Sequence, residues 1–194
     1  MDLVLSGAGL LLCWPLIAGA WIVATISTGQ NGLFRQERIG RDGEPFNVLK
    51  IRTMRASGGL TVTVAGDERV TRVGTILRRL KIDELPQLVN VLWGEMSLVG
   101  PRPDVPGFAD RLVGEDRCVL TVRPGITGPA AIVYRHEEVL LAGAQDPEAY
   151  SRDVIWPDKV RINREYVENW SLMTDLRCLL GTISSVVNTD GGSA

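Results

Sequence analysis

Two adjacent carboxylates, Asp83 and Glu84, stand between arginines in the sequence, with Arg78 before them and Arg102 after them in the loop VGPRP. Guanidinium groups bind phosphate oxygens through paired hydrogen bonds. A carboxylate acts as a nucleophile, a base or a ligand of a hard metal ion. This set is therefore compatible with chemistry on a phosphate, although an Asp-Glu pair that opens a helix more often only caps that helix.

The apolar spacing after the two carboxylates predicts a helix from about Asp83 to Trp93. The stripe repeats at i, i+3, i+4 and i+7 and consists of Leu85, Leu88, Val89 and Leu92. Asp83 would then lie at or near the N-cap, where the partial positive charge of the helix end keeps a carboxylate ionised. A preceding helix is expected over Val70–Leu80 and carries Arg78.

Further cations belong to a predicted β-hairpin and to a second glycine-proline loop. The runs Leu33–Ile39 and Pro45–Met54 are β-prone and flank GRDGE, in which Asp-Gly is a strong turn signal. Alternation along KIRTM places Lys50 and Arg52 on one face of the second strand. The loop RPGITGP contributes Arg123. The glycine-containing stretch 56–68 is expected to be a loop, either a lid or a plain connector.

The later part of the chain predicts more helix. Leu172–Val187 is expected to be a helix with an apolar stripe of Leu176, Leu179, Leu180 and Ile183. This stripe would pack on the core or lie on a membrane surface, and core packing is the default expectation.

The first part of the chain predicts a membrane segment, because residues 3–26 contain no charged side chain. One helix of this length would be about 36 Å long, enough for a hydrocarbon core of about 30 Å. Pro15, near its centre, predicts a kink. Two geometries stay open: a kinked helix that spans, or a broken helix that enters one leaflet and returns. Arg35, Arg38 and Arg41 place the downstream part on the cytoplasmic side in both.

Charge and cysteine usage narrow the function classes. The net charge is −2, yet residues 28–82 hold 11 basic against 5 acidic side chains, whereas residues 103–194 hold 9 against 14. Such polarity favours a face for phosphates or anionic lipid, although two ordinary solvated faces would look the same. The three cysteines are scattered and His136 is the only histidine, which argues against a zinc site and for a reducing compartment.

Three ordered stretches resemble the monotopic bacterial phosphoglycosyl transferases, the bacterial sugar transferase family. They are FRQERIGRDGEPFNVLKIRTM, GTILRRLKIDELPQLVNVLWGEMSLVGPRP and RPGITGP, and the resemblance runs from residue 2 to about residue 180. It implies an α-rich α+β fold, with a re-entrant helix–break–helix over residues 1–27. A compact cytosolic catalytic domain with a β-hairpin and amphipathic interfacial helices follows over residues 28–194. Pro15 matches the break proline of the family, which favours re-entry.

The resemblance also implies a reaction. Asp83 would attack the sugar-bearing phosphorus of a UDP-sugar, release UMP and leave a sugar-phosphoryl-aspartate, from which polyprenyl (undecaprenyl) phosphate takes the sugar phosphate. This step starts the assembly of a glycoconjugate such as an exopolysaccharide, an O-antigen or a glycoprotein glycan. Mg²⁺ is the implied cofactor, with Asp83 and Glu84 as its ligands. The expected phosphate-binding residues are Arg78, Arg102, Lys50, Arg52 and Arg123.

The expected localisation is the cytoplasmic face of a bacterial inner membrane. The expected partners include membrane lipid and no nucleic acid. The alternative is a non-enzymatic membrane-anchored module that binds anionic lipid or nucleotide. The chain departs from the family where Trp14 replaces a common serine and where PAAIVYRHEE follows Gly128. That second departure makes Arg135, His136 and Glu137 candidates for substrate contact, or part of a surface loop. The sugar, the glycan pathway and the oligomeric state, with a homodimer as one option, stay open.

Overall fold

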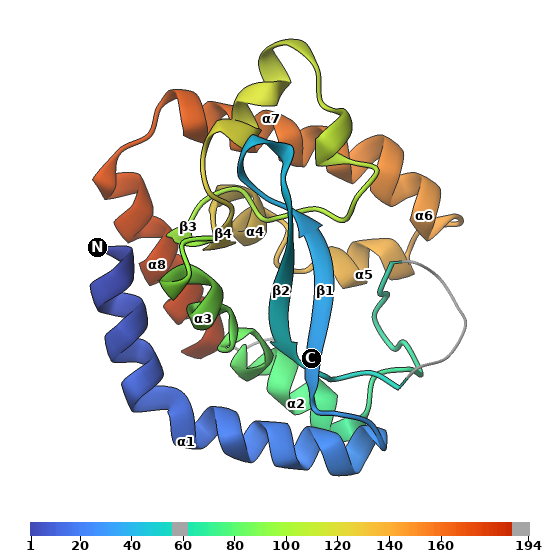
Figure 1. Ribbon diagram of the computed structural model, residues 1–194. Helices are drawn as coiled ribbons and strands as arrows, with labels where there is room; N and C mark the ends of the chain where they lie inside the picture. The colour runs from blue at the N-terminus through green and yellow to red at the C-terminus, as the bar shows by residue number, and fades with distance from the viewer. Residues whose placement is uncertain (56–61, 188–194) are drawn as a thin grey trace.

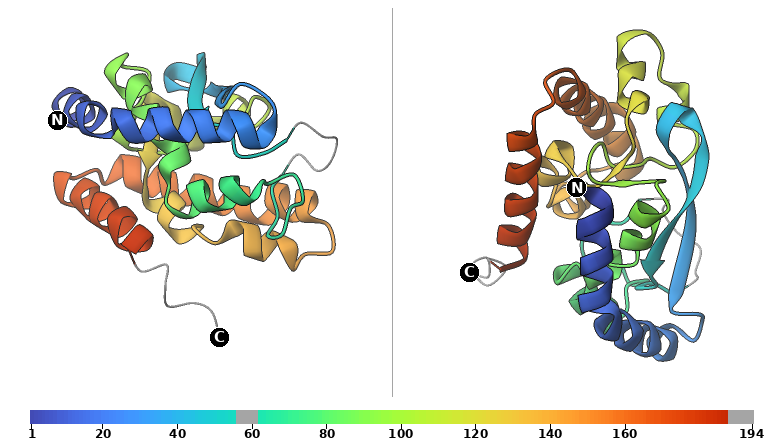
Figure 2. Two further views of the ribbon diagram at one scale, coloured as in Figure 1. Left: turned by 90° about the horizontal axis from the view of Figure 1, so that it is seen from below. Right: turned by 60° about the vertical axis from the view of Figure 1, so that its left-hand side comes forward.

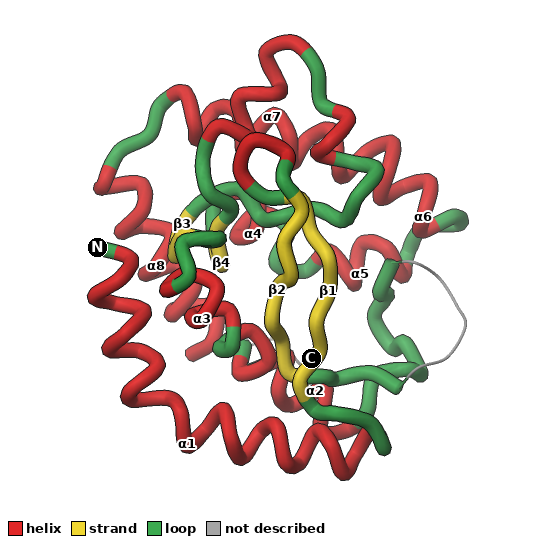
Figure 3. The backbone as a smooth tube through the Cα atoms, in the orientation of Figure 1, coloured by secondary structure: helices red, strands yellow, loops and turns green. Residues whose placement is uncertain are grey.

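The computed structural model describes residues 1–55 and 62–187, and it is rich in helix (Figures 1 and 3). Residues 56–61 of the predicted loop lie outside this description. The elements in chain order are α1 (Asp2–Thr28), β1 (Leu33–Ile39), β2 (Pro45–Ile51), α2 (Arg72–Arg79), α3 (Gln87–Leu92), β3 (Ser97–Val99), β4 (Gly125–Thr127), α4 (Pro129–Val133), α5 (Glu137–Ala142), α6 (Pro147–Tyr150), α7 (Trp156–Glu168) and α8 (Leu172–Val187). Helices with two small sheets confirm the α-rich α+β class.

Strands β1 and β2 form the predicted antiparallel hairpin, with Phe34 opposite Lys50. At its turn, Asp42 and Gly43 have φ angles of 60° and 85°. This left-handed region is open to glycine and tolerated by aspartate, so the Asp-Gly signal predicted the turn correctly. Strands β3 and β4 form a second, parallel pair, which joins the two glycine-proline loops of the chain.

Helix α1 is long and apolar enough to cross a membrane, with a mean hydropathy of 2.0 over its most apolar window. It bends near its middle, so that its two halves run along two different sides of the globular part (Figures 1 and 2). Pro15 lies inside the helix, where the missing N–H and the ring clash favour a bend. The predicted kink is therefore present, while the helical backbone continues from Asp2 to Thr28.

Both halves of α1 contact the globular part. In the second half, Ala20 and Ala24 are buried against Ile51 of β2 and Leu77 of α2. In the first half, Gly9 faces Leu88 of α3 so closely that an added Cβ would lie 3.2 Å from the leucine methyl group.

The first half of α1 is also held by charge. The carboxylate of Asp2 accepts a hydrogen bond of 3.3 Å from Arg123. Between these attachments the apolar side chains around the bend, such as Leu11, Leu12 and Trp14, are exposed.

Helix α8 corrects one expectation. Of the predicted stripe, Leu179 packs beside the cluster of Val99, Tyr166 and Cys178, whereas Leu176, Leu180 and Ile183 are exposed. The reason is that α8 is rotated so that Asp175, Cys178 and Leu179 face inward. The hydroxyl of Tyr166 on α7 donates a 2.7 Å hydrogen bond to the buried carboxylate of Asp175, which holds this orientation. Core packing was thus the wrong default for most of the stripe.

Candidate active site

The two carboxylates lie in a tight 3-10 turn, Ile82–Glu84, rather than at the start of an α-helix. Lys81 before them adopts the left-handed conformation with φ 56°, which separates this turn from α2. Helix α3 begins only at Gln87, and Pro86 is its N-cap. The prediction of an α-helix from about Asp83, with Asp83 at or near its N-cap, was therefore wrong, because a 3-10 turn after the left-handed Lys81 precedes the regular helix.

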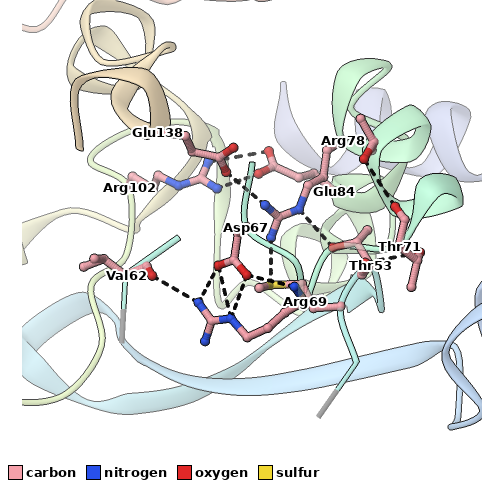
Figure 4. Close-up of polar contacts among 11 residues, drawn as sticks. Thr53, Val62, Asp67, Arg69, Thr71, Arg78, Glu84, Arg102 and Glu138 are labelled. Atoms are coloured by element: carbon pink, nitrogen blue, oxygen red, sulfur yellow. Dashed lines mark hydrogen bonds and ion pairs between the residues drawn. The ribbon is translucent and has the colours of Figure 1, made fainter. Parts of the chain in front are cut away.

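Glu84 is paired with Arg102, which the resemblance gave as an expected phosphate-binding residue. The Nη2 and Nη1 atoms of Arg102 donate to the two carboxylate oxygens of Glu84 at 2.5 and 3.5 Å (Figure 4). Burial would raise the pKa of Glu84, but the charges of Arg102 and then Lys50 hold it well below its usual range. Glu84 is therefore ionised at neutral pH and fixes the position of Arg102.

The loop that carries Arg102 is held by a close backbone contact between the two glycine-proline loops. The N–H of Gly100 donates to Thr127 O, and the N–H of Gly125 donates to Pro101 O. A Cβ at Gly125 would lie 2.1 Å from the nitrogen of Gly100. Only glycine fits at this approach, which explains why both loops carry it.

Lys50 reaches the same site from β2. Burial, followed by the nearby charge of Arg102, lowers the pKa of Lys50 to about 7, while Glu84 and Asp83 oppose this decrease. Arg38 on β1 is half-buried. Its charge acts on Lys50, and it donates a 3.0 Å hydrogen bond to Pro103 O. The sequence suggested Lys50 through strand alternation, whereas Arg38 was considered only as a sign of membrane orientation.

Asp83, in contrast to Glu84, has no hydrogen-bond or ion-pair partner among the described residues. It is 9% exposed, and its buried Oδ1 atom has no hydrogen-bond partner within the described residues. Burial, together with the charge of Glu84, raises the pKa of Asp83 to about 6, although Lys50, Lys81 and Arg78 act in the opposite direction. Asp83 thus stays mostly ionised at neutral pH through nearby cations, and not through a helix N-terminus as the sequence suggested.

Arg78 completes the cation set and is held at three points (Figure 4). Its Nε atom donates to Thr53 Oγ1 at 3.0 Å, its Nη2 atom contacts Met54 Sδ at 3.2 Å, and its Nη1 atom donates to Glu138 Oε1 at 2.9 Å. Thr53 and Met54 follow β2, so the end of the hairpin orients this guanidinium group.

Two predicted phosphate-binding residues lie elsewhere. Arg52 stacks over Phe34, with its Cζ atom 4.9 Å from the ring centroid, and donates to Asn31 O. Arg123 pairs with Asp2. Within residues 1–55 and 62–187, neither arginine forms a hydrogen bond or ion pair with Asp83 or Glu84. Strand alternation alone could not show that the pairing of β1 and β2 ends at Ile51, just before Arg52.

Sequence reasoning missed Asn90. This fully buried amide accepts a hydrogen bond from Leu49 N and donates to Asn47 O and to Glu95 Oε2. It locks α3 onto β2 and so fixes the turn with the carboxylates relative to the strand that carries Lys50. A polar residue beside a predicted leucine stripe was the signal available in the sequence.

The carboxylates suit a cation that is shared with a substrate. Among the described residues, no group of three or more His, Cys, Asp and Glu side chains gathers to form a metal cage. Mg²⁺ is commonly held by one or two carboxylates together with substrate phosphates and water. The unpartnered oxygen of Asp83 fits this role, whereas the oxygens of Glu84 already face Arg102.

Comparison with known proteins gives a consistent result. Residues 1–189 match the family described as bacterial sugar transferase. The chain is 38% identical to a UDP-glucose:undecaprenyl-phosphate glucose-1-phosphate transferase of Caulobacter vibrioides, over 98% of this chain and 69% of that protein. It is 33% identical to the exopolysaccharide production protein ExoY of Rhizobium meliloti, over 98% and 85%. An uncharacterized sugar transferase of Haemophilus influenzae is 32% identical, and the chain spans 41% of its length. The chain therefore belongs to the bacterial sugar transferase family.

Proposed function

We propose that this transferase moves a sugar 1-phosphate from a UDP-sugar to polyprenyl phosphate through a covalent bond to Asp83. The observation that carries the proposal is a buried carboxylate with one unpartnered oxygen among Arg78, Lys50 and the Glu84–Arg102 pair. A nucleophilic carboxylate must be ionised and free of strong hydrogen bonds, and the phosphate that it attacks needs cations around it. The names of relatives, which mention UDP-glucose and undecaprenyl phosphate, support the same donor and acceptor classes.

The proposed reaction has two displacements at one phosphorus atom. A carboxylate oxygen of Asp83 attacks the phosphorus that bears the sugar, the bond to the oxygen of the UMP phosphate breaks, and UMP leaves. An oxygen of polyprenyl phosphate then attacks the same phosphorus, and the bond to Asp83 breaks to give polyprenyl-diphosphate-sugar. Arg78 and Lys50 offset the charge of the phosphates, and Glu84 holds Arg102 in place. A bound Mg²⁺ would supply further charge neutralisation to the diphosphate.

The attachment of α1 supports a re-entrant helix. Asp2, near one end, pairs with Arg123, and Ala24, near the other end, packs on the globular part. A helix that crosses a bilayer of about 30 Å cannot contact one cytoplasmic domain near both ends. The exposed apolar side chains around the bend would then enter one leaflet of the inner membrane, which brings a lipid phosphate to the site from the cytoplasmic face.

The covalent step is tested by release of UMP without any lipid acceptor. Purified full-length protein, Mg²⁺ and a panel of UDP-sugars should give a burst of UMP and a phosphosugar mass adduct on Asp83. The variant Asp83→Asn should give neither, whereas Asp42→Asn at the exposed hairpin turn should behave as the parent. A non-enzymatic binding module produces no UMP at all. An Asp83→Asn protein with full turnover would remove Asp83 from the mechanism.

The topology is tested by thiol labelling in intact cells. A cysteine inserted after Met1, in a background where Cys13, Cys118 and Cys178 are serine, should react with a membrane-impermeant reagent only after lysis. Labelling of intact cells would instead show that the helix spans the membrane.

A further inference from the structure

Helix α5 brings two carboxylates to a site that is otherwise rich in cations. Glu137 accepts a 2.6 Å hydrogen bond from Lys159 of α7, and Glu138 accepts one of 2.9 Å from Arg78 of α2 (Figure 4). The two partners of this second pair are far apart in the sequence. The Glu138 side chain is 52% exposed and Arg78 is 25% exposed. Glu138 therefore covers Arg78 from the solvent side.

The orientation of Arg78 does not depend on Glu138. Its Nε and Nη2 atoms are already engaged by Thr53 and Met54, so the guanidinium plane is set by the end of the hairpin. Removal of Glu138 would leave Nη1 as a free donor in an unchanged position. A phosphate oxygen that binds Arg78 at this edge must compete with the Glu138 carboxylate for the same N–H.

We infer that Glu138 is an internal counter-ion, which a diphosphate must displace from Arg78 before it can bind. The inference rests on the proposed function only in that Arg78 binds the phosphates of the donor. In the absence of donor, Glu138 balances the charge of Arg78. Without it, the positive charge of Arg78 would add to those of Lys50 and Lys81, which act on the same carboxylate, Asp83. Glu138 is a positioning residue that sets donor affinity, because a half-exposed carboxylate can rotate into water when a phosphate arrives.

The size of the effect follows from the exposure of the pair. Exposed ion pairs contribute little to stability, so the competition should weaken donor binding by about two- to fivefold. The variant Glu138→Gln should therefore bind a diphosphate more tightly than the parent by this factor. A role in folding alone predicts the opposite, namely weaker binding together with a lower melting temperature.

The test uses calorimetric titration of the full chain in nonionic detergent and Mg²⁺, with UDP as the probe. Glu138→Gln should lower the Kd for UDP, and Glu138→Asp, which keeps the charge, should stay near the parent value. The matched control is Glu165→Gln. Glu165 is a 57% exposed glutamate that pairs with Arg161 at 2.6 Å on α7, so its replacement should leave UDP binding unchanged.

Two further variants separate a direct exchange from a general effect of charge. Glu137→Gln removes the same charge one residue away and should not reproduce the gain. In an Arg78→Gln background, checked for folding by its melting temperature, Glu138→Gln should have no further effect on UDP binding. The inference would be overturned if Glu138→Gln bound UDP no more tightly than the parent. It would also be overturned if Glu137→Gln raised UDP affinity equally, or if Glu138→Gln raised it fully in the Arg78→Gln background.

Release of UMP, measured in parallel, keeps the two proposals apart. If UDP binds and Glu138→Gln lowers its Kd, but no UDP-sugar yields UMP, only the proposed transferase reaction fails. If UMP is released and Glu138→Gln leaves the Kd for UDP unchanged, only the counter-ion inference fails. A parent protein that neither binds UDP nor releases UMP from any UDP-sugar would overturn both.

Discussion

Replacement of the proposed nucleophile should stabilise the protein. Asp83 has a folded-state pKa of about 6 against an ordinary value of 3.8 because it is buried. At about 1.4 kcal/mol for each pH unit, ionised Asp83 costs about 3 kcal/mol of folding free energy at pH 7. Asp83→Asn keeps the shape and removes the charge. We therefore expect this inactive variant to be more stable than the parent by up to about 3 kcal/mol, or about 6–12 °C in melting temperature for a chain of this size.

The sign of this effect depends on pH in a defined way. Below about pH 4 the carboxyl is protonated in both the folded and the unfolded chain, so the cost is absent. Between about pH 4 and pH 6 only the unfolded chain loses its proton, so the parent loses stability as the pH rises. Above about pH 6 the folded chain is ionised as well and the difference between parent and Asp83→Asn becomes constant.

The measurement is thermal unfolding of the full chain in nonionic detergent with a chelator, followed by tryptophan fluorescence at pH 4, 5, 6 and 7. The control is Asp42→Asn, whose side chain is 69% exposed and which should change stability by less than about 0.5 kcal/mol. Equal melting temperatures of parent and Asp83→Asn at pH 7, or a gain that is the same at pH 4 and pH 7, would refute the assignment of a buried, costly carboxylate.

Four other changes have defined outcomes. Lys50→Met removes a charge that lowers the pKa of Asp83, so the acid limb of UMP release, expected near pH 6, should move to higher pH. Arg102→Gln leaves Glu84, which is 12% exposed, without its partner. Urea unfolding should show a loss of about 2 kcal/mol, between the values for exposed and buried pairs. Asn90→Ala removes three hydrogen bonds and should cost about 2–3 kcal/mol in the same assay. Mg²⁺ should raise the melting temperature of the parent more than that of Asp83→Asn.

Local signals in the sequence predicted the local structure. The Asp-Gly pair predicted the hairpin turn because the left-handed backbone there depends on two residues alone. The uncharged run with Pro15 predicted a long bent helix, because an apolar run and a proline within it also act on the local backbone alone. The grouping of Asp83, Glu84 and Arg102 followed from resemblance to a family, since spacing along the chain does not determine which loops meet in space.

Features that depend on tertiary packing escaped prediction. The environment of Asp83 is set by burial and by cations from other elements, so helix-end reasoning gave the wrong cause for its ionisation. Glu138 contacts Arg78 across 60 residues, and no local pattern indicates this pair. The exposed face of α8 depends on the buried contact between Tyr166 and Asp175, which the apolar periodicity of the helix does not encode.

Helix α3 links α1 to the site because both of its faces are occupied. Leu88 and Leu92, from the predicted apolar stripe, lie against Gly9 and Gly7 of α1. The opposite face carries Gln87, Asn90 and Val91, which are buried toward the globular part. An amphipathic helix of a soluble protein would turn its leucines inward. Here the leucines face α1, while Asn90 fixes α3 to β2. The turn with the two carboxylates lies just before α3, so its position relative to both α1 and Lys50 is set by one short helix.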